Sequence, residues 1–214
     1  GNAGYTYRVP TYTELFIAIP GFLEGNSNLN PEEAVSAEFG IKYFKKRFNA
    51  YAALFYRNTN NLIDYSKETA SDPLIATNLP GEISSKGFEM DLNYIFRTGN
   101  ISHQIATNYT FIEDEVKDLN LDFLRYSVNS LKHQFTSSLR SQLTKSLNIN
   151  VVYKHAERTA GLSYNVWDAS LIYAFKQAEF TFTASNIFDA DYFEQGIIPM
   201  PPSNVLFGLR YYFK

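Results

Sequence analysis

Hydrophobic and polar residues alternate along most of the 214-residue chain, in segments separated by turns or loops. In residues 204–213, for example, the pattern places Val205, Phe207 and Leu209 on the face opposite Asn204, Gly208 and Arg210. A period of two places successive side chains on opposite faces of a β-strand. The chain is therefore predicted to be all-β, with a possible first strand at residues 1–9. Nine further segments show the pattern: 35–44, 48–57, 86–96, 101–112, 134–143, 147–157, 165–175, 179–188 and 204–213.

The lengths of these segments and of their connections favour an antiparallel up-and-down barrel. A tilted strand of about 9–11 residues crosses a bilayer, whereas no apolar run here approaches the roughly 18 residues of a spanning helix. Outer-membrane barrels have short periplasmic turns and long extracellular loops. The connections alternate in the same way, tight at 45–47, 97–100, 144–146 and 176–178, and mostly longer at 58–85, 113–133, 158–164 and 189–203.

The two faces of the predicted strands also fit a transmembrane barrel. Aromatic residues make up 16% of the chain, and several lie near strand ends, where girdles at the membrane interfaces are expected. Alternation by itself also fits a soluble β-sandwich or a soluble ligand-binding barrel, which remains the alternative. Of the charges predicted to face the lumen, the cations either guide an anionic substrate or pair with the carboxylates along the wall, and pairing is the preferred reading. These charges are Glu38, Glu89, Asp91, Arg140, Lys154 and Arg210.

Several function classes find no support in the sequence. The net charge of −3 gives no reason to expect a nucleic-acid partner, and the absence of cysteine excludes disulfides and thiolate metal sites. No nucleophile elbow or glycine-rich phosphate loop is present, so we expect neither an enzyme nor a bound cofactor. The three histidines, at positions 103, 133 and 155, lie in or beside separate strands, and a position at the membrane edge is preferred over a metal site.

Two sets of loop residues are candidates for binding. Asp114, Glu115 and Asp118 form a weak calcium candidate in an acidic loop, for which a solvated loop is the preferred reading. Aromatic loop residues offer a large contact area with a polar tip to a bulky substrate, although packing between loops is the preferred reading for any single one of them. These ligand candidates are Tyr12, Phe16, Tyr65, Tyr126, Tyr164, Tyr192 and Phe193.

Several segments resemble those of TonB-dependent receptors. Residues 8–16 (RVPTYTELF) resemble the family's R-x-P-(S/T)-x-x-E-L-(F/Y) segment, and residues 25–32 (GNSNLNPE) resemble G-N-P-x-L-x-P-E, with Ser27 in place of proline. The last strand resembles the terminal assembly strand of the family, although Lys214 follows Phe213. Further resemblances occur, in family order, at residues 38–40 (E-x-G), 55–64 (F-Y-x-x-x-x-N-x-I), 87–89 (G-x-E) and 184–192 (N-L-F-D-x-x-Y).

The resemblance implies a barrel of about 22 strands around an N-terminal plug. Residues 1–214 would supply the C-terminal nine or ten strands, and we expect the plug and the TonB-contacting segment to lie outside them. The implied location is the bacterial outer membrane, and the implied activity is import of a scarce nutrient such as a ferric siderophore or cobalamin. Membrane lipid, that nutrient and TonB, through the N-terminal region, are the implied partners.

Two local expectations complete the prediction. Residues 10–34 contain prolines that a central strand does not accommodate, so they are expected to form an extracellular loop. Within that loop, residues 31–33 are predicted to open a helical turn capped by Asn30. Because ten is an even number of strands, the chain either closes into a smaller barrel or pairs its edges with another copy, and we favour a closed or nearly closed antiparallel barrel.

Overall fold

The computed structural model describes residues 1–67, 69, 71–116, 123–124, 130–159, 161–195 and 198–213. The chain divides into two compact units. Unit 1 comprises residues 1–40, 53–88 and 112–130, and unit 2 comprises residues 41–52, 89–111 and 131–214. Because each unit gathers three segments of the chain, several long strands contribute one part to each unit.

Ten long strands form one sheet, in the order β1-β4-β5-β8-β9-β11-β12-β13-β14-β17. Every segment predicted from the alternation is a strand, so the all-β fold is confirmed. The bounds are β1 Asn2–Arg8, β4 Glu32–Lys45, β5 Phe48–Asn60, β8 Glu82–Thr98, β9 Ile101–Val116, β11 Leu131–Gln142, β12 Leu147–Arg158, β13 Ser163–Phe175, β14 Ala178–Ser185 and β17 Asn204–Tyr211.

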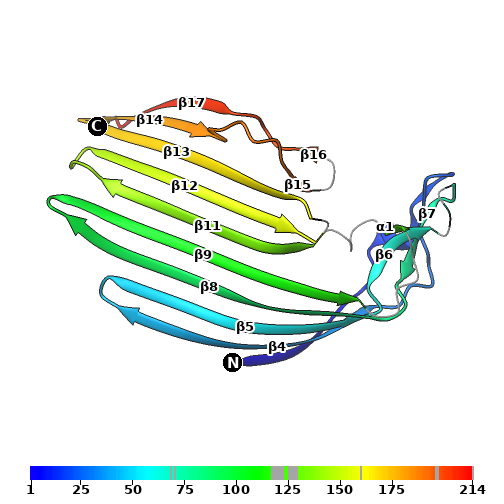
Figure 1. Ribbon diagram of the computed structural model, residues 1–214. Coiled ribbons are helices and arrows are strands. Elements are labelled where there is room, and N and C mark those ends of the chain that lie inside the picture. The colour runs from blue at the N-terminus through cyan, green and yellow to red at the C-terminus, as the bar shows by residue number, and fades with distance from the viewer. Residues whose placement is uncertain are drawn as a thin grey trace. The chain divides into compact units, whose positions relative to one another are not determined.

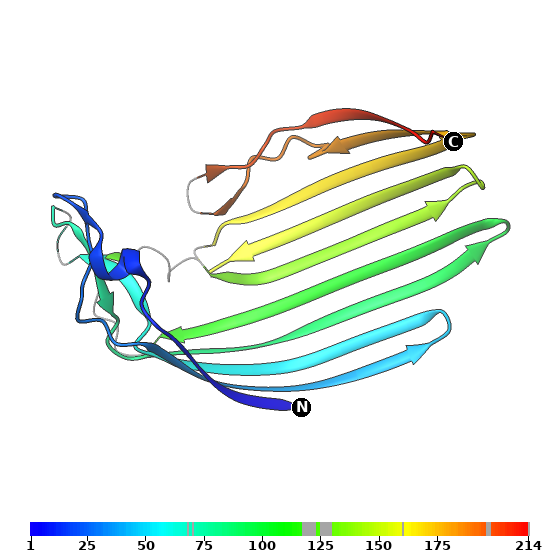
Figure 2. The same ribbon diagram turned by 180° about the vertical axis from the view of Figure 1, so that it is seen from behind.

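Four tight turns join consecutive long strands within unit 2, after β4, β8, β11 and β13. Figure 1 shows these turns together at one end of the unit 2 strands, with β15 (Phe193–Gln195) and β16 (Ile198–Pro199) towards the other end, and Figure 2 shows the same from behind. Gly99 and Lys176 have φ angles of 59° and 55°, the left-handed region that tight hairpins use. The predicted up-and-down order with tight turns at one end is confirmed.

The register of unit 2 separates apolar from polar side chains across neighbouring strands. On one face Val151 of β12 lies between Leu139 and Ala169. On the opposite face, which we call the polar face, Asn150 lies between Arg140 and Ser170. Large side chains of the apolar face stay exposed, among them Trp167, Tyr173, Phe182, Phe207 and Leu209. A soluble sandwich would bury such a face under a second sheet.

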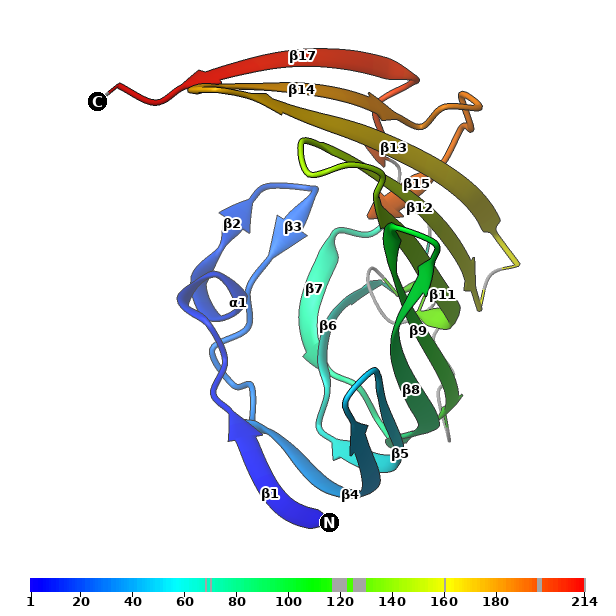
Figure 3. The ribbon, with the colours of Figure 1, turned by 90° about the vertical axis from the view of Figure 1, so that its left-hand side faces the viewer.

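Unit 1 contains folded elements in the stretches that the sequence predicted to be loops. A five-stranded sheet has the order β10-β6-β7-β3-β2, and Leu23, Tyr65 and Ala76 form its buried core. Figure 3 shows the short helix α1 (Tyr12–Phe16) beside the β2–β3 hairpin, with β7 and β6 next to it. The strands are β2 Ala18–Ile19, β3 Leu23–Glu24, β6 Ile63–Lys67, β7 Leu74–Asn78 and β10 Phe123–Leu124.

The helical turn predicted at residues 31–33 is wrong, because β4 begins at Glu32 and pairs with β1. The helical turn of this region is α1, which begins after Thr11. The Thr11 hydroxyl accepts a hydrogen bond from the Glu14 amide at 3.2 Å, and the Glu14 carboxylate accepts one from the Thr11 amide at 2.6 Å. This capping box satisfies two amides that a short helix would otherwise leave unpaired. In the described part of the chain, no helix has the length and apolarity needed to cross a membrane.

The strand order does not show the fully closed form of the closed or nearly closed ten-stranded barrel that the sequence favoured. β1 and β17 are the two ends of the strand order, and among the described residues each pairs with one long strand only, β1 with β4 and β17 with β14. An even number of strands permits closure but does not drive it, because closure also requires a matching register and stagger. The sheet therefore has two open edges.

Candidate ligand-binding site

Two of the segments that resemble the receptor family meet at Arg8 in unit 1. The Arg8 guanidinium donates to Glu32 from Nε at 2.6 Å and from Nη2 at 2.7 Å, and to Glu14 from Nη1 at 2.9 Å and from Nη2 at 3.1 Å. Glu32 Oε1 also accepts the Ile63 amide at 2.8 Å. We call these side chains the Arg8 cluster. Two bidentate pairs around one guanidinium fix the geometry of β1, α1 and β4.

Electrostatics within the Arg8 cluster keep the carboxylates ionised. Partial burial disfavours the charged form of Glu14, but hydrogen bonds from Arg8 and Thr11 outweigh it and hold the pKa of Glu14 below its usual value. Both carboxylates are mostly shielded, with side chains 14% (Glu14) and 12% (Glu32) exposed. One guanidinium is shared by two carboxylates, and all four of its hydrogen bonds join β1 to α1 and β4, so the cluster holds these elements of unit 1 together.

Gly25 docks the second family segment against the first. Its amide donates to the Ile17 carbonyl at 2.7 Å, and the next amide, of Asn26, donates to the Glu14 carbonyl at 2.8 Å. A Cβ atom at position 25 would lie 2.7–2.8 Å from backbone atoms of residues 15–17. Only glycine allows so close an approach of two backbones. These two segments therefore build the scaffold of unit 1.

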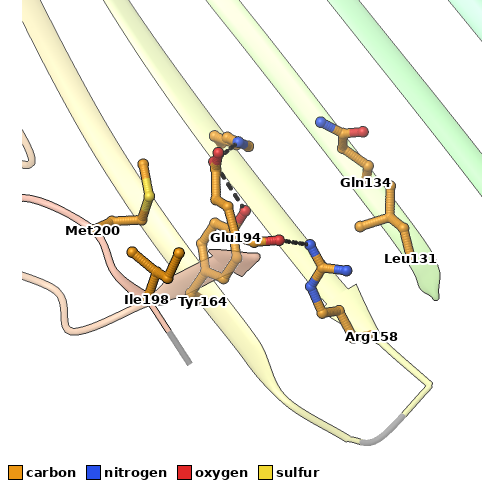
Figure 4. A pocket seen from close by; sticks show the side chains of 8 residues that line it. Leu131, Gln134, Arg158, Tyr164, Glu194, Ile198 and Met200 are labelled. Atoms are coloured by element: carbon orange, nitrogen blue, oxygen red, sulfur yellow. Dashed lines mark hydrogen bonds and ion pairs between the residues drawn. The ribbon is translucent and has the colours of Figure 1, made fainter. Parts of the chain in front are cut away.

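A pocket of about 400 Å³ lies on the polar face of unit 2. The register aligns Gln134, Ala156 and Tyr164 across β11, β12 and β13, which places Tyr164 on the polar face. Figure 4 shows Ile198 and Met200 on one side of Glu194, and Arg158 on the other. The full lining is Leu131, Gln134, Lys154, Arg158, Tyr164, Glu194, Ile198 and Met200.

Charged and phenolic groups converge on Glu194 of β15. The Lys154 ammonium and the Tyr164 hydroxyl both bind Glu194 Oε1, the hydroxyl at 3.3 Å, and the Arg158 guanidinium donates to the Glu194 carbonyl oxygen. Figure 4 marks these contacts. The hydrogen bond from Lys154 is the main cause that lowers the pKa of Glu194, against partial burial. With two cations and one carboxylate, the pocket has a net positive charge.

Aromatic rings line the same region. The rings of Tyr164 and Tyr192 lie 4.6 Å apart between centroids, and the Lys154 ammonium lies 5.6 Å from the Tyr164 ring centroid. The planes of the two rings are tilted by 39° to each other, and a cation over a ring is attracted by its π-electrons. A pocket with cations, a phenol and an apolar side at Ile198 and Met200 suits a ligand that combines anionic oxygens with apolar groups.

Asn186 holds the connection that carries Glu194 and Tyr192. Asn186 is 3% exposed. Its side-chain oxygen accepts a hydrogen bond from the Ala190 amide at 2.8 Å, and its side-chain nitrogen donates to the Ala190 carbonyl at 2.9 Å. It also donates to the Pro201 carbonyl at 3.3 Å, and its own amide donates to Asp168 at 2.8 Å. Asp189 accepts the Ser203 amide at 2.7 Å. The family-like segment at residues 184–192 therefore shapes one wall of the pocket.

The structure brings together three residues that the sequence predicted in two separate sets. Lys154, from the predicted lumen charges, meets Tyr164 and Tyr192 from the loop aromatics, while Phe193 is exposed on β15. In unit 1, Tyr12 and Phe16 form an exposed pair on α1, with ring centroids 5.0 Å apart.

Two other aromatic candidates lie elsewhere. Tyr65 is 7% exposed and belongs to the unit 1 core, which is the packing role left open from the sequence. Tyr126 lies outside the described residues.

The ion pairs of the predicted lumen charges differ from those expected. Lys154 pairs with Glu194, and Arg210 pairs with Glu179 at 3.2 Å, neither of which is a pairing expected from the sequence, and the pairing with Glu38, Glu89 or Asp91 stays a prediction. Asp91 accepts a hydrogen bond from the Asn108 amide group. Glu38 lies opposite Asn2 of β1, Glu89 lies on β8, and Arg140 lies opposite Asn150 and Gln104.

The acidic loop gives no support to a calcium site. Asp114 accepts a hydrogen bond from the Ser85 hydroxyl at 2.5 Å, and Glu113 pairs with Lys86 at 3.2 Å. Within the described residues, no group of three or more histidine, aspartate or glutamate side chains has an arrangement that could hold a metal. Because Asp118 is outside the described part, the calcium site with Asp114 and Glu115 stays a prediction.

The three histidines each contact an aromatic or polar neighbour in unit 2. His103 stacks on Phe96 at 4.8 Å between centroids and contacts the Ser141 hydroxyl at 2.8 Å. His133 contacts the Tyr109 hydroxyl at 2.8 Å, and His155 contacts the Asn165 side chain at 3.0 Å. The register places all three on the apolar face, in keeping with the membrane-edge position preferred from the sequence.

Sequence reasoning missed Arg158, Glu194, Gln134 and Met200 as pocket residues. A usable signal existed for Arg158, because residues 154, 156 and 158 share one face of a strand. No local pattern marks Glu194, because its position depends on how residues 186–203 fold back over β12 and β13.

Residues 1–211 match the protein family described as TonB dependent receptor-like, beta-barrel. The match spans nearly the whole chain, so the chain belongs to this family, and the resemblance identified from its motifs is confirmed. TonB-dependent receptors sit in the bacterial outer membrane and act in transport rather than as enzymes. This membership confirms the predicted location and the absence of an enzymatic role, and the soluble alternative is wrong.

Solved structures of such receptors share the fold. The siderophore receptor PirA from Acinetobacter baumannii is 19% identical, with a TM-score of 0.72, over 99% of this chain and 38% of that chain. The ferric-catecholate import receptor Fiu from E. coli K12 is 20% identical, with a TM-score of 0.69, over 99% and 32%. The copper transporter OprC is 17% identical, with a TM-score of 0.72, over 99% and 36%. The chain thus spans about a third of the length of each.

Proposed function

We propose that residues 1–214 form the C-terminal part of the barrel of a receptor that imports a ferric siderophore. The pocket around Lys154, Arg158 and Tyr164 is the observation that carries this proposal. Ferric siderophore complexes often carry anionic oxygens around the iron and apolar or aromatic groups outside them. Cations favour the first feature, and the Tyr164–Tyr192 rings favour the second.

Similar structures guide the choice of nutrient. PirA and Fiu are named as receptors for siderophores or ferric catecholates, and OprC as a copper transporter. We therefore propose a ferric siderophore ahead of cobalamin, the other nutrient that the family resemblance suggested. Copper is a weaker candidate, since within the described residues the pocket offers one thioether, Met200, and no imidazole.

The remaining parts of the receptor would come from outside these residues. We propose that an N-terminal region supplies both the plug and the segment that contacts TonB, and that further strands pair with the open edges of β1 and β17. An exposed edge strand has unpaired amides and carbonyls, which a neighbouring strand satisfies. In that arrangement the polar face of unit 2 would line the lumen and its apolar face would contact outer-membrane lipid.

Calorimetric titration of the purified full-length receptor tests the proposal. The ligands are a ferric catecholate, a ferric hydroxamate and a ferric carboxylate siderophore, with cobalamin and Cu²⁺ as competitors. We expect saturable binding of at least one ferric siderophore, and loss of growth on that siderophore as sole iron source when the receptor gene is deleted. Saturable binding of cobalamin or Cu²⁺ alone would overturn the proposal.

A further inference from the structure

Glu194 occupies the position in the pocket where an anionic ligand group would bind best. Its carboxylate Oε1 is held between the Lys154 ammonium and the Tyr164 hydroxyl, and these groups are donors. Arg158 anchors the same residue through its carbonyl oxygen. The arrangement is that of a bound carboxylate in a small anion site, except that the carboxylate belongs to the chain itself.

Three features make this carboxylate exchangeable. The side chains of Lys154 and Glu194 are 29% and 37% exposed, so the ion pair remains in contact with solvent. Partly exposed ion pairs contribute little to stability, because water screens them and both side chains lose freedom in forming them. The pocket of about 400 Å³ beside the pair gives an entering group room to reach Lys154 before Glu194 leaves.

A comparison within unit 2 shows that the ion pair is not needed to hold the chain there. The connection from β14 to β17 is already fixed by the hydrogen bonds of Asn186 and by the Ser203 amide on Asp189. The Met200 amide also donates to the Tyr192 carbonyl at 3.0 Å. Release of the Glu194 carboxylate would therefore leave its backbone in place, and only a side chain would move.

We infer that Glu194 is a built-in competitor that an anionic oxygen group of the ligand displaces from Lys154 and Tyr164, an inference that rests on the proposed function of this pocket. A ligand with a strong negative charge replaces the carboxylate and gains both donors, with Arg158 close by as a second cation. A neutral ligand gains less from Lys154 than Glu194 does, and so leaves it in place. Glu194 thus makes the pocket selective for charged ligands, because a ligand must bind Lys154 more strongly than the Glu194 carboxylate does.

Charge-matched probes and a single isosteric substitution test the inference. A ferric tris-catecholate is anionic and a ferric tris-hydroxamate is neutral, and both present iron inside a shell of oxygens. In the full-length receptor, Glu194→Gln should tighten binding of the tris-catecholate on the order of tenfold, the scale of one removed like charge nearby. The affinity for the tris-hydroxamate should change by less than about twofold.

Two further variants separate the possible outcomes. Lys154→Gln should weaken tris-catecholate binding, and Glu179→Gln, which removes a carboxylate from the polar face outside this pocket, should leave both affinities unchanged. If Glu194→Gln weakens binding or leaves it unchanged while Lys154→Gln weakens it, the inference is overturned and the proposed site stands. If neither variant affects binding of any probe, the pocket is not the ligand site and both proposals fail.

Folding of each variant is checked by its heat-dependent mobility on a denaturing gel, which distinguishes folded from unfolded barrels. If Glu194→Gln does not fold, Glu194→Ala provides the same test, since it also removes the carboxylate. An increase in tris-catecholate affinity with Glu194→Ala supports the inference, and a decrease overturns it.

Discussion

The Arg8 cluster of unit 1 and the Lys154–Glu194 pair of unit 2 are both hydrogen-bonded ion pairs, but they have different roles. In both, a cation on a long strand binds a carboxylate on a short element, α1 in one case and β15 in the other. Arg8 makes four hydrogen bonds to two shielded carboxylates, whereas Glu194 is 37% exposed beside a cavity. The first contact fixes a loop, and the second leaves a carboxylate that a ligand can replace.

The largest effect is expected from Arg8→Ala. This substitution leaves Glu14 and Glu32 shielded and without their cation, and unpaired buried charges are costly. Because the Arg8 side chain is itself 41% exposed, we expect a loss of about 2 kcal/mol rather than the full cost of a buried pair. Amide hydrogen exchange in the full-length receptor should show roughly thirtyfold faster exchange at residues 12–26.

The control for this prediction is Arg57→Ala. Arg57 is an exposed arginine of β5 that also lies in unit 1, so its removal should leave exchange at residues 12–26 unchanged. Equal effects of the two substitutions would mean that the Arg8 cluster does not hold α1 in place.

Asn186→Ala should have the next largest effect, and it should be confined to unit 2. The substitution leaves the amide of Ala190 and the carbonyls of Ala190 and Pro201 without the Asn186 side chain. Losing these contacts at a buried position should cost about 1–2 kcal/mol. We expect faster amide exchange at residues 187–193, with residues 12–26 unaffected.

Asn204→Ala is the matched control, because Asn204 is an exposed asparagine whose side chain donates to the nearby Pro202 carbonyl at 3.1 Å. Faster exchange in both units after Asn186→Ala would contradict a local role for Asn186.

These two regions also mark where sequence reasoning succeeded and where it stopped. The long strands were predictable because each of them alternates over its own length, and the register then follows from keeping Leu139, Val151 and Ala169 on one face. The motif at residues 8–16 pointed to the family. Its structural role, a guanidinium shared by Glu14 and Glu32, could not be read from it, because Arg8 and Glu32 are 24 positions apart in the sequence. Such pairing leaves no periodic trace in the sequence.

The pocket was predictable only in part for the same reason. Lys154 and Tyr164 lie on regular strands, where parity gives the face, and Tyr192 was found as a loop aromatic. Glu194 reaches Lys154 across 40 positions because Asn186 and Asp189, with φ angles of 49° and 53°, turn the chain back. Asparagine and aspartate adopt the left-handed backbone conformation more readily than most residues, but their presence in a sequence does not predict that they will adopt it.

Lowering the pH should weaken both the Arg8 cluster and the contact between Glu194 and Lys154. The pKa of Glu14 and the pKa of Glu194 are both lowered in the folded chain, by their hydrogen bonds to Arg8 and Lys154. A carboxylate with a lowered pKa stabilises the fold above its unfolded pKa, about 4.3 for glutamate, and this stabilisation is lost as the pH falls through the lower folded value. Protonation removes charge but keeps the side chain, so the effect should be smaller than that of Arg8→Ala.

Hydrogen exchange, corrected for its intrinsic pH dependence, checks this at a series of pH values from about 6 to about 3. Protection of residues 12–26 should be constant down to about pH 5 and should fall below about pH 4. In the Glu14→Gln variant the pH-dependent part should be reduced. A fall in protection that begins near pH 6 would point to a histidine instead and would contradict this assignment.

The smallest effect is expected for Arg210→Gln, which extends the comparison to a third ion pair. Arg210 Nη1 lies 3.2 Å from Glu179 Oε1, and the two side chains are 69% and 26% exposed. A contact with so exposed a cation should contribute very little to stability, because water and salt screen it. A double-substitution cycle with Glu179→Gln, followed by exchange at residues 179–184, measures the coupling of the pair. A coupling as large as the effect of Arg8→Ala would contradict the ordering of these ion pairs by exposure, and would show that position on the polar face matters more than solvent contact.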